Sequence, residues 1–144
     1  MADLSITAAE VQPGADGEFY DGTAGETITA GMPCYLSATD NKLYKADANT
    51  LSQANVKGLS THGASASQPL RVQTDGAILL GATANPPVGT VYWLSETAGG
   101  IAPFVDLDAG GMYGTYLGVA NADDELILNI HATGVLLAAF DSSP

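Results

Sequence analysis

The sequence predicts an all-β protein: a compact barrel-like or sandwich-like fold built from two related β-units, with an extended N-terminal arm. Three observations lead to this prediction. The 144 residues include 17 glycines and 7 prolines, which interrupt the chain at short intervals. The segments between them are short apolar runs bounded by turn residues, and long helix-forming stretches are few. The third observation is an internal repeat, in which two separate segments recur at one common offset.

The repeat relates residues 31–37 (GMPCYLS) to residues 89–95 (GTVYWLS), and residues 70–76 (LRVQTDG) to residues 128–134 (LNIHATG). The offset is 58 positions in both cases (89 − 31 and 134 − 76). A third match, displaced by two more residues, joins Lys57-Gly58-Leu59 to Leu117-Gly118-Val119. A solenoid needs about three or more repeats to bury its core, so a period that occurs twice predicts two β-units packed together.

These matches divide the chain into an N-terminal arm (1–25), a first β-unit (26–84) and a second β-unit (85–144). The total length suits one compact domain. In the arm, residues 13–17 and 21–25 are rich in glycine and break any long element.

The first unit is expected to contain five short strands, separated by turn residues. They are residues 33–36, 43–45, 56–60, 70–73 and 77–80. Thr39-Asp-Asn41 predicts a hairpin between the first two strands, and Asp75-Gly76 a tight turn between the last two. Asp47–Ala54 is the one segment that suggests a short helix, because Asp or Asn could cap it.

The second unit is expected to repeat this pattern. Its first strand lies within the repeat segment 89–95, and the others are residues 101–104, 113–119, 125–130 and 135–139. Glu96–Gly100 corresponds to the first hairpin turn, and Thr133-Gly134 is predicted to be the final tight turn.

Charge excludes several classes of partner. Lys and Arg number 4 against 16 for Asp and Glu, a formal charge of −12, so no basic patch for nucleic acid or anionic lipid can be assembled. No apolar run approaches the length of a membrane span, and the first seven residues do not resemble a signal peptide. We therefore expect synthesis in the cytoplasm, with no membrane partner.

The sequence contains no recognisable catalytic, cofactor-binding or metal-binding motif. Cys34 is the single cysteine and lies in an apolar stretch, which predicts a small buried side chain. His62 and His131 are the only histidines and neither lies in a supporting motif, so exposed or hydrogen-bonded structural roles are expected.

Two small groups of carboxylates, Asp106-Leu-Asp108 and Asp123-Asp-Glu125, are interpreted as solvated loops. Calcium binding and glycoside hydrolysis remain as alternatives, although the regular ligand spacing of an EF-hand is missing and sugar-binding aromatics are scarce.

Two sets of residues are candidates for contact with a partner. In the arm, Leu4, Ile6 and Val11 are the candidate contact residues, and the alternation Leu4, Ile6, Ala8 could form one strand that completes the protein's own sheet or adds to the exposed edge of a neighbour. In the second unit, the aromatic group that contains Tyr92, Trp93, Phe104 and Tyr113 predicts core packing with one residue at the rim, and Trp93 is the candidate interface anchor.

Across nearly the whole chain the sequence resembles the capsid cement, or head decoration, proteins of tailed bacteriophages. The resemblance rests on structural glycines and strand residues. These are the segments 25–36 (GETITAGMPCYL), 40–47 (DNKLYKAD), 56–59 (VKGL), 89–95 (GTVYWLS), 99–103 (GGIAP), 116–119 (YLGV), 126–130 (LILNI) and 132–134 (ATG).

The resemblance implies a non-enzymatic β-rich protein that binds the outer surface of the phage head and stabilises contacts between major capsid subunits. It also implies a homo-oligomer, with a trimer favoured, and synthesis in the host bacterial cytoplasm. Acidic character is consistent with an outer surface, because it is unfavourable against packaged DNA. The alternatives are a β-rich module of a tail or receptor-binding fibre and, less favoured, a small hydrolase.

Overall fold

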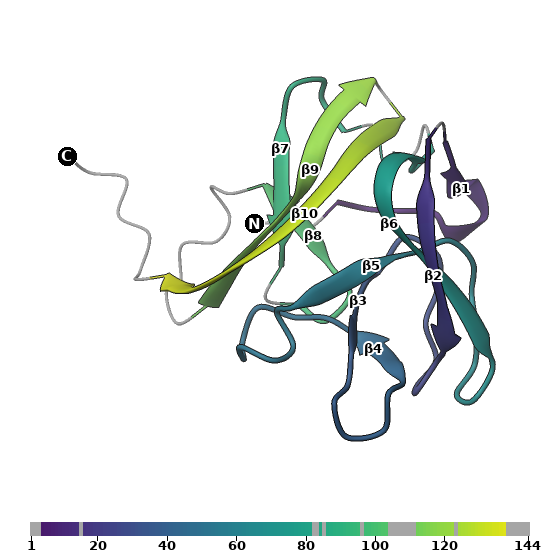
Figure 1. Cartoon of the computed structure of the whole chain (residues 1–144). Coiled ribbons are helices and arrows are strands. Elements are labelled where there is room, and N and C mark those ends of the chain that lie inside the picture. Colours follow the sequence, from purple (N-terminus) through teal and green to yellow (C-terminus); the bar gives the residue numbers. More distant parts are fainter. Residues whose placement is uncertain are drawn as a thin grey trace.

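The computed structural model describes residues 4–14, 16–81, 84, 86–95, 97–103, 112–122 and 124–137. In these residues the protein is all-β, which confirms the predicted class. Ten strands form one sheet that curls into a half-barrel (Figure 1), and a single 3-10 turn, Ala8–Glu10, precedes the first strand.

All strand pairs in the sheet are antiparallel. The strands are β1 (Gln12–Pro13), β2 (Glu18–Thr23), β3 (Pro33–Leu36), β4 (Leu43–Lys45), β5 (Val56–Ser60), β6 (Pro69–Leu79), β7 (Val91–Leu94), β8 (Ile101–Pro103), β9 (Met112–Ala122) and β10 (Glu125–Leu137). Their order in the sheet is β4-β3-β5-β6-β10-β9-β7-β8, and β1 and β2 also pair with β6.

Strand β6 organises the sheet because it changes partners along its length. In its first half, Val72 pairs with Tyr20 of β2 on one edge and with Ser60 of β5 on the other. In its second half, Ile78 pairs with Pro13 of β1 and with Leu126 of β10. β6 therefore belongs to both halves of the sheet and joins them.

The two halves of the sheet pair their strands in the same way. Tyr35 of β3 pairs with Tyr44 of β4, and Trp93 of β7 pairs with Ala102 of β8, 58 positions later in each strand (93 − 35 and 102 − 44). The β3–β5 and β7–β9 pairs each contain one irregularity, which makes Lys57 and Leu117 the extra residues of two β-bulges. The strand pairs of the two halves therefore match at the same offset of 58 residues that relates the repeated sequence segments.

Two clusters of buried side chains stabilise this arrangement. The first lies among β2, β3, β4 and β6 and contains Ala24, Ile28, Cys34, Leu43, Ala64, Leu70 and Val72. The larger second cluster joins β7–β10 to the second half of β6, and its members include Ile78, Leu80, Tyr92, Leu94, Ile101, Leu117, Leu126 and Leu128. Both combine residues of the connecting segments with inward positions of the strands, as in β6, where Leu70 and Val72 are buried and Arg71 between them is exposed.

The described part of the N-terminal segment packs against the protein's own core, so a free extended arm is not confirmed. The Leu4 amide donates to the Ile101 carbonyl of β8 at 2.8 Å, and Val11 is buried. In the first half of the sheet the Gly25 amide donates in the same way to the Leu43 carbonyl of β4, also at 2.8 Å. Leu43 and Ile101 are again 58 positions apart (101 − 43), so both outer strands are covered by a preceding segment of the same chain.

Three local predictions were wrong. Asp75-Gly76 and Thr133-Gly134 do not reverse the chain but lie within the continuous strands β6 and β10. Gly76 has φ of +86°, next to a register shift in the β2–β6 pair, so this glycine bends the strand where it changes partners. Residues 47–54 form turns instead of a helix, because the Asp47 carboxylate accepts from the Asn49 amide at 2.9 Å and closes a local turn.

Cys34 is fully buried and free, as the sequence predicted. Burial, together with the nearby Glu26 carboxylate, raises the pKa of its thiol from 9.0 to about 12. Because the folded-state pKa is raised, the stabilisation of the neutral thiol is present below pH 9 and is lost as the pH rises through about 12.

We therefore expect Cys34 to react with iodoacetamide at pH 8 about 100-fold or more slowly in the native protein than in urea, because the thiol reacts only when the core opens. Mass spectrometry of timed samples measures both rates. A native rate close to the unfolded rate would contradict the buried position.

Candidate functional site

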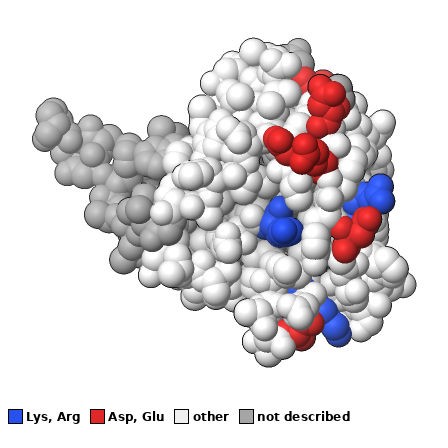
Figure 2. Space-filling model, viewed as in Figure 1, with Lys and Arg blue, Asp and Glu red and all other residues white. Residues whose placement is uncertain are grey.

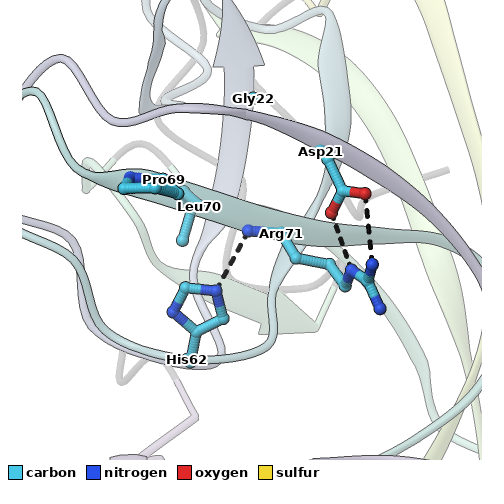
Figure 3. Close-up of a pocket in the computed structure, with 6 residues that line it drawn as sticks. All are labelled: Asp21, Gly22, His62, Pro69, Leu70 and Arg71. Atoms are coloured by element: carbon cyan, nitrogen blue, oxygen red, sulfur yellow. Dashed lines mark hydrogen bonds and ion pairs between the residues drawn. The ribbon is translucent and has the colours of Figure 1, made fainter.

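A shallow hollow of about 380 Å³ lies where β2 and β6 run side by side. Figure 3 shows the side chains that line it, namely Asp21, Gly22, His62, Pro69, Leu70 and Arg71. The pairing of Asp21 with Arg71 across the two strands places their side chains on the same face.

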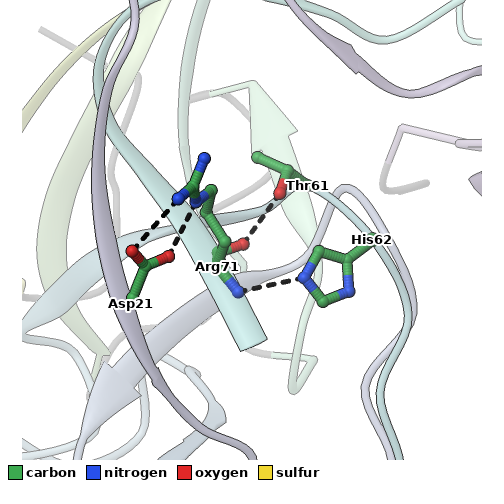
Figure 4. A network of polar contacts seen from close by, with 4 residues as sticks. All are labelled: Asp21, Thr61, His62 and Arg71. Carbon is green, nitrogen blue, oxygen red and sulfur yellow. Dashed lines mark hydrogen bonds and ion pairs between the residues drawn. The ribbon is translucent and has the colours of Figure 1, made fainter. Parts of the chain in front are cut away.

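The two charged residues of this hollow neutralise each other. Arg71 Nε donates to Asp21 Oδ1 at 2.7 Å and Arg71 Nη2 donates to Asp21 Oδ2 at 3.1 Å, a two-point pair that Figure 4 shows in full. The guanidinium also lies 5.2 Å from the centre of the Phe19 ring. The hydrogen bond from Arg71 lowers the pKa of the Asp21 carboxyl below 3.8. Both side chains are exposed, so the pair adds little to stability.

His62 has both ring nitrogens engaged in the same network. Its Nδ1 lies 2.9 Å from the Gly63 carbonyl oxygen, and its Nε2 accepts from the Arg71 backbone amide at 3.1 Å. These partners assign the neutral tautomer with the proton on Nδ1. The Thr61 hydroxyl donates to the Arg71 carbonyl at 2.9 Å (Figure 4). The Thr61 and His62 side chains therefore fasten the loop after β5 to the Arg71 backbone of β6, and the Asp21–Arg71 pair joins β2 to β6.

The Asp21–Arg71 pair gives a pH-dependent prediction. The folded-state pKa of Asp21 is lowered, so its stabilising effect is present above pH 3.8 and is lost as the pH falls through the folded-state pKa. We expect Asp21→Asn to be slightly less stable than the natural protein near neutral pH, and the two to become equal in strong acid.

Urea denaturation of both proteins at a series of pH values measures the difference. Asp75→Asn is the control, because Asp75 is an exposed carboxylate on β6 that has no ion pair with Arg71. A difference between Asp21→Asn and the natural protein that does not change with pH would show that the ion pair is not its source.

A second hollow, of about 610 Å³, lies at the fork where β6 passes from β5 to β10. Its lining comes from five strands and their ends and consists of Phe19, Tyr20, Leu36, Asn55, Val56, Lys57, Thr74 and Ile130. The Lys57 ammonium lies 4.7 Å from the centre of the Tyr20 ring, so the side chain crosses the aromatic face.

The candidate contact residues from the sequence are not brought together. Leu4, Ile6 and Val11 all pack against the larger core cluster. Trp93 is half-buried and meets the Tyr116 ring edge-to-face, with ring centres 5.7 Å apart. Each of these side chains therefore has a packing role within the described fold.

Among the described residues, four large apolar side chains are exposed instead: Phe19 (39%), Leu51 (53%), Val88 (62%) and Val91 (39%). Sequence reasoning missed them. Val88 and Val91 flank a turn that the repeat identifies, but the equivalent residues of the first unit, Ala30 and Pro33, are buried. The repeat therefore gave no signal that this turn would be exposed.

The remaining candidate groups are described only in part. Asp106, Asp108, Asp123 and Phe104 lie outside the described residues, whereas Glu125 accepts a hydrogen bond from Asn121 at 2.8 Å. Where the chain is described, no group of three or more His, Cys, Asp or Glu could hold a metal ion. His131 is exposed and pairs with Tyr116 across β9 and β10.

The surface charge is unevenly distributed. All four basic residues, Lys42, Lys45, Lys57 and Arg71, belong to the first half of the sheet. Figure 2 shows that most acidic side chains on this face lie toward its upper right, with one more acidic group at the bottom, and that basic groups at the right and at the bottom lie beside acidic ones. In the described part of the chain, no helix is long and apolar enough to cross a membrane.

No protein-family model matches the chain. No curated protein matches it either. The function must therefore be inferred from the resemblance described above and from the geometry of the surface.

Proposed function

We propose that this protein is a non-enzymatic capsid cement protein, which binds the outer surface of a phage head and stabilises contacts between major capsid subunits. In this proposal it is made in the host bacterial cytoplasm and joins the assembled shell as a small homo-oligomer, with a trimer favoured. We further propose that its two halves arose by internal duplication.

The observation that carries the proposal is the pair of matching β-units, whose outer strands β4 and β8 are both covered by the chain itself. Covered edges protect a β-protein from uncontrolled strand addition, so that binding is left to its side-chain surface. The shared register at an offset of 58 residues supports the duplication. A module of this kind suits a protein that binds an assembled capsid and stabilises the contacts between its subunits.

The polar groups of the first hollow also fit a structural role. His62 uses both ring nitrogens to hold backbone groups, and Arg71 and Asp21 bind each other. The exposed apolar residues Phe19, Val88 and Val91 offer contact area to a partner protein. A shell gains stability from any protein that binds only its assembled form, and identical weak contacts at symmetric sites add up.

Cosedimentation with undecorated, expanded shells of the phage that encodes the protein tests this proposal, followed by imaging of the pellet. We expect saturable binding at regular outer sites, and light scattering of the free protein shows whether a trimer forms beforehand. Absence of binding to authentic expanded shells would reject the cement proposal and favour the tail-fibre alternative, which a glycan screen examines.

A further inference from the structure

The second hollow, at the fork of the sheet, has a lining that suits an anionic group. Besides the Tyr20 hydroxyl, three of its side chains are hydrogen-bond donors: the Asn55 amide, the Lys57 ammonium and the Thr74 hydroxyl. None of these three has a hydrogen bond or ion pair from its side chain to another described residue. The rest of the lining is aromatic or aliphatic, and no carboxylate belongs to it, although the chain has 16 acidic residues.

The contrast with the first hollow is chemical. There, Asp21 already neutralises the cation Arg71. In the second hollow the Lys57 ammonium has no carboxylate partner among the described residues and lies against the face of the Tyr20 ring, an interaction that leaves the ammonium able to bind an acceptor. This part of an otherwise acidic protein therefore presents a positive charge without a described ion-pair partner in a concave, partly apolar setting.

The fold fixes where Lys57 points. It is the extra residue of the bulge between β3 and β5, a position that directs its side chain out of the regular ladder. The matching bulge residue in the second half of the sheet, Leu117, is fully buried in the core. The same backbone position is thus used for packing in one half and carries an exposed charge in the other.

We propose that this hollow binds a carboxylate side chain, from an aspartate or glutamate, on the surface of the partner protein. The carboxylate pairs with Lys57 and accepts from Asn55 or Thr74, while the carbon chain behind it contacts Tyr20 and Ile130. Charge complementarity selects this occupant, because the lining provides donors and a cation and no acceptor carboxylate. The inference rests on the proposed function, in which the partner is the major capsid protein.

The test compares binding of three variants to the undecorated shells used above. Lys57→Met keeps the aliphatic stem over Tyr20 and removes the charge, Lys57→Arg keeps the charge, and Lys42→Met removes a charge outside the hollow. We expect Lys57→Met to bind about tenfold or more weakly, and Lys57→Arg and Lys42→Met to stay within about threefold of the natural protein. Raising the salt from about 50 mM to about 300 mM should weaken the natural protein more than Lys57→Met.

Thermal denaturation of each variant separates binding from folding, because Lys57 is exposed and its replacement should leave the midpoint almost unchanged. If the natural protein binds shells and Lys57→Met binds equally well, the carboxylate site is rejected while the cement proposal stands. Equal losses for Lys57→Met and Lys57→Arg, or for Lys57→Met and Lys42→Met, would also reject it. If the natural protein does not bind shells at all, it is the proposed function that fails.

Discussion

Gly118→Ala is expected to lower the free energy of unfolding by about 3 kcal/mol or more. Gly118 lies between Tyr92 of β7 and Leu128 of β10, so backbone surrounds it on both sides. A β-carbon there would overlap the Ile127 carbonyl oxygen. This oxygen belongs to the sheet and cannot move without breaking the β9–β10 pair, so the strand itself must shift.

The same constraint exists in the other half of the sheet. Gly58 follows the bulge at Lys57 as Gly118 follows Leu117, and a β-carbon on Gly58 would lie 2.6 Å from the Gln73 carbonyl oxygen. Gly58→Ala should therefore cost a similar amount. Gly63→Ala is the matched control, because its nearest neighbour would be an oxygen at 3.5 Å and the stability should stay within about 0.5 kcal/mol or rise slightly. Urea denaturation measures all three, and equal values for Gly118→Ala and Gly63→Ala would refute the close approach.

The double variant Ile6→Ala, Val11→Ala is expected to lose about 3 kcal/mol of stability in the isolated protein. Val11 is buried, and Ile6 is half-buried against the larger core cluster. Both side chains lie over Gly31, where an added β-carbon would be 2.8 Å from Ile6 Cγ2 and 3.1 Å from Val11 Cγ2. Removing five methyl or methylene groups from this contact uncovers the turn that precedes β3.

Leu51→Ala is the control for this second prediction, since Leu51 is 53% exposed and its truncation should change stability by less than about 0.5 kcal/mol. Urea denaturation without any partner is the decisive condition. If the double variant is as stable as the natural protein, residues 6 and 11 have no role in the isolated fold, and their role as contacts for a neighbouring subunit becomes the better explanation.

Much of the fold could be predicted from particular residues. The runs Pro33–Leu36, Leu43–Lys45 and Val56–Ser60 are strands with the bounds expected from the sequence, because turn residues mark both ends of each. Cys34 is buried for the reason its apolar neighbours suggested. By contrast, the prediction of tight turns at Gly76 and Gly134 is wrong. A glycine after a polar residue occurs both within irregular strands and in hairpin turns, so the sequence does not distinguish the two.

The candidate site could be predicted only in small part. His62 and Lys57 were visible in the sequence as isolated polar residues, but their partners Arg71 and Tyr20 lie 9 and 37 positions away (71 − 62 and 57 − 20). No local pattern connects residues at such separations. The Asp21–Arg71 pair depends on the register of β2 against β6, which the sequence did not predict because residues 18–23 were assigned to the arm.

The acidic charge and the common offset of 58 residues can be read directly from the sequence, and the all-β class and the short strands can be predicted from it. These predictions succeed because composition, turn residues and repeats are properties of local segments. Three features could not be predicted from the sequence and are seen only in the folded protein. β6 runs unbroken through both halves of the sheet, and the N-terminal segment covers β8. Lys57 faces a hollow, while the matching residue Leu117 faces the core. Strand register and side-chain burial depend on contacts between segments that are distant in the sequence. These contacts form only when the whole chain folds, so no local pattern predicts them.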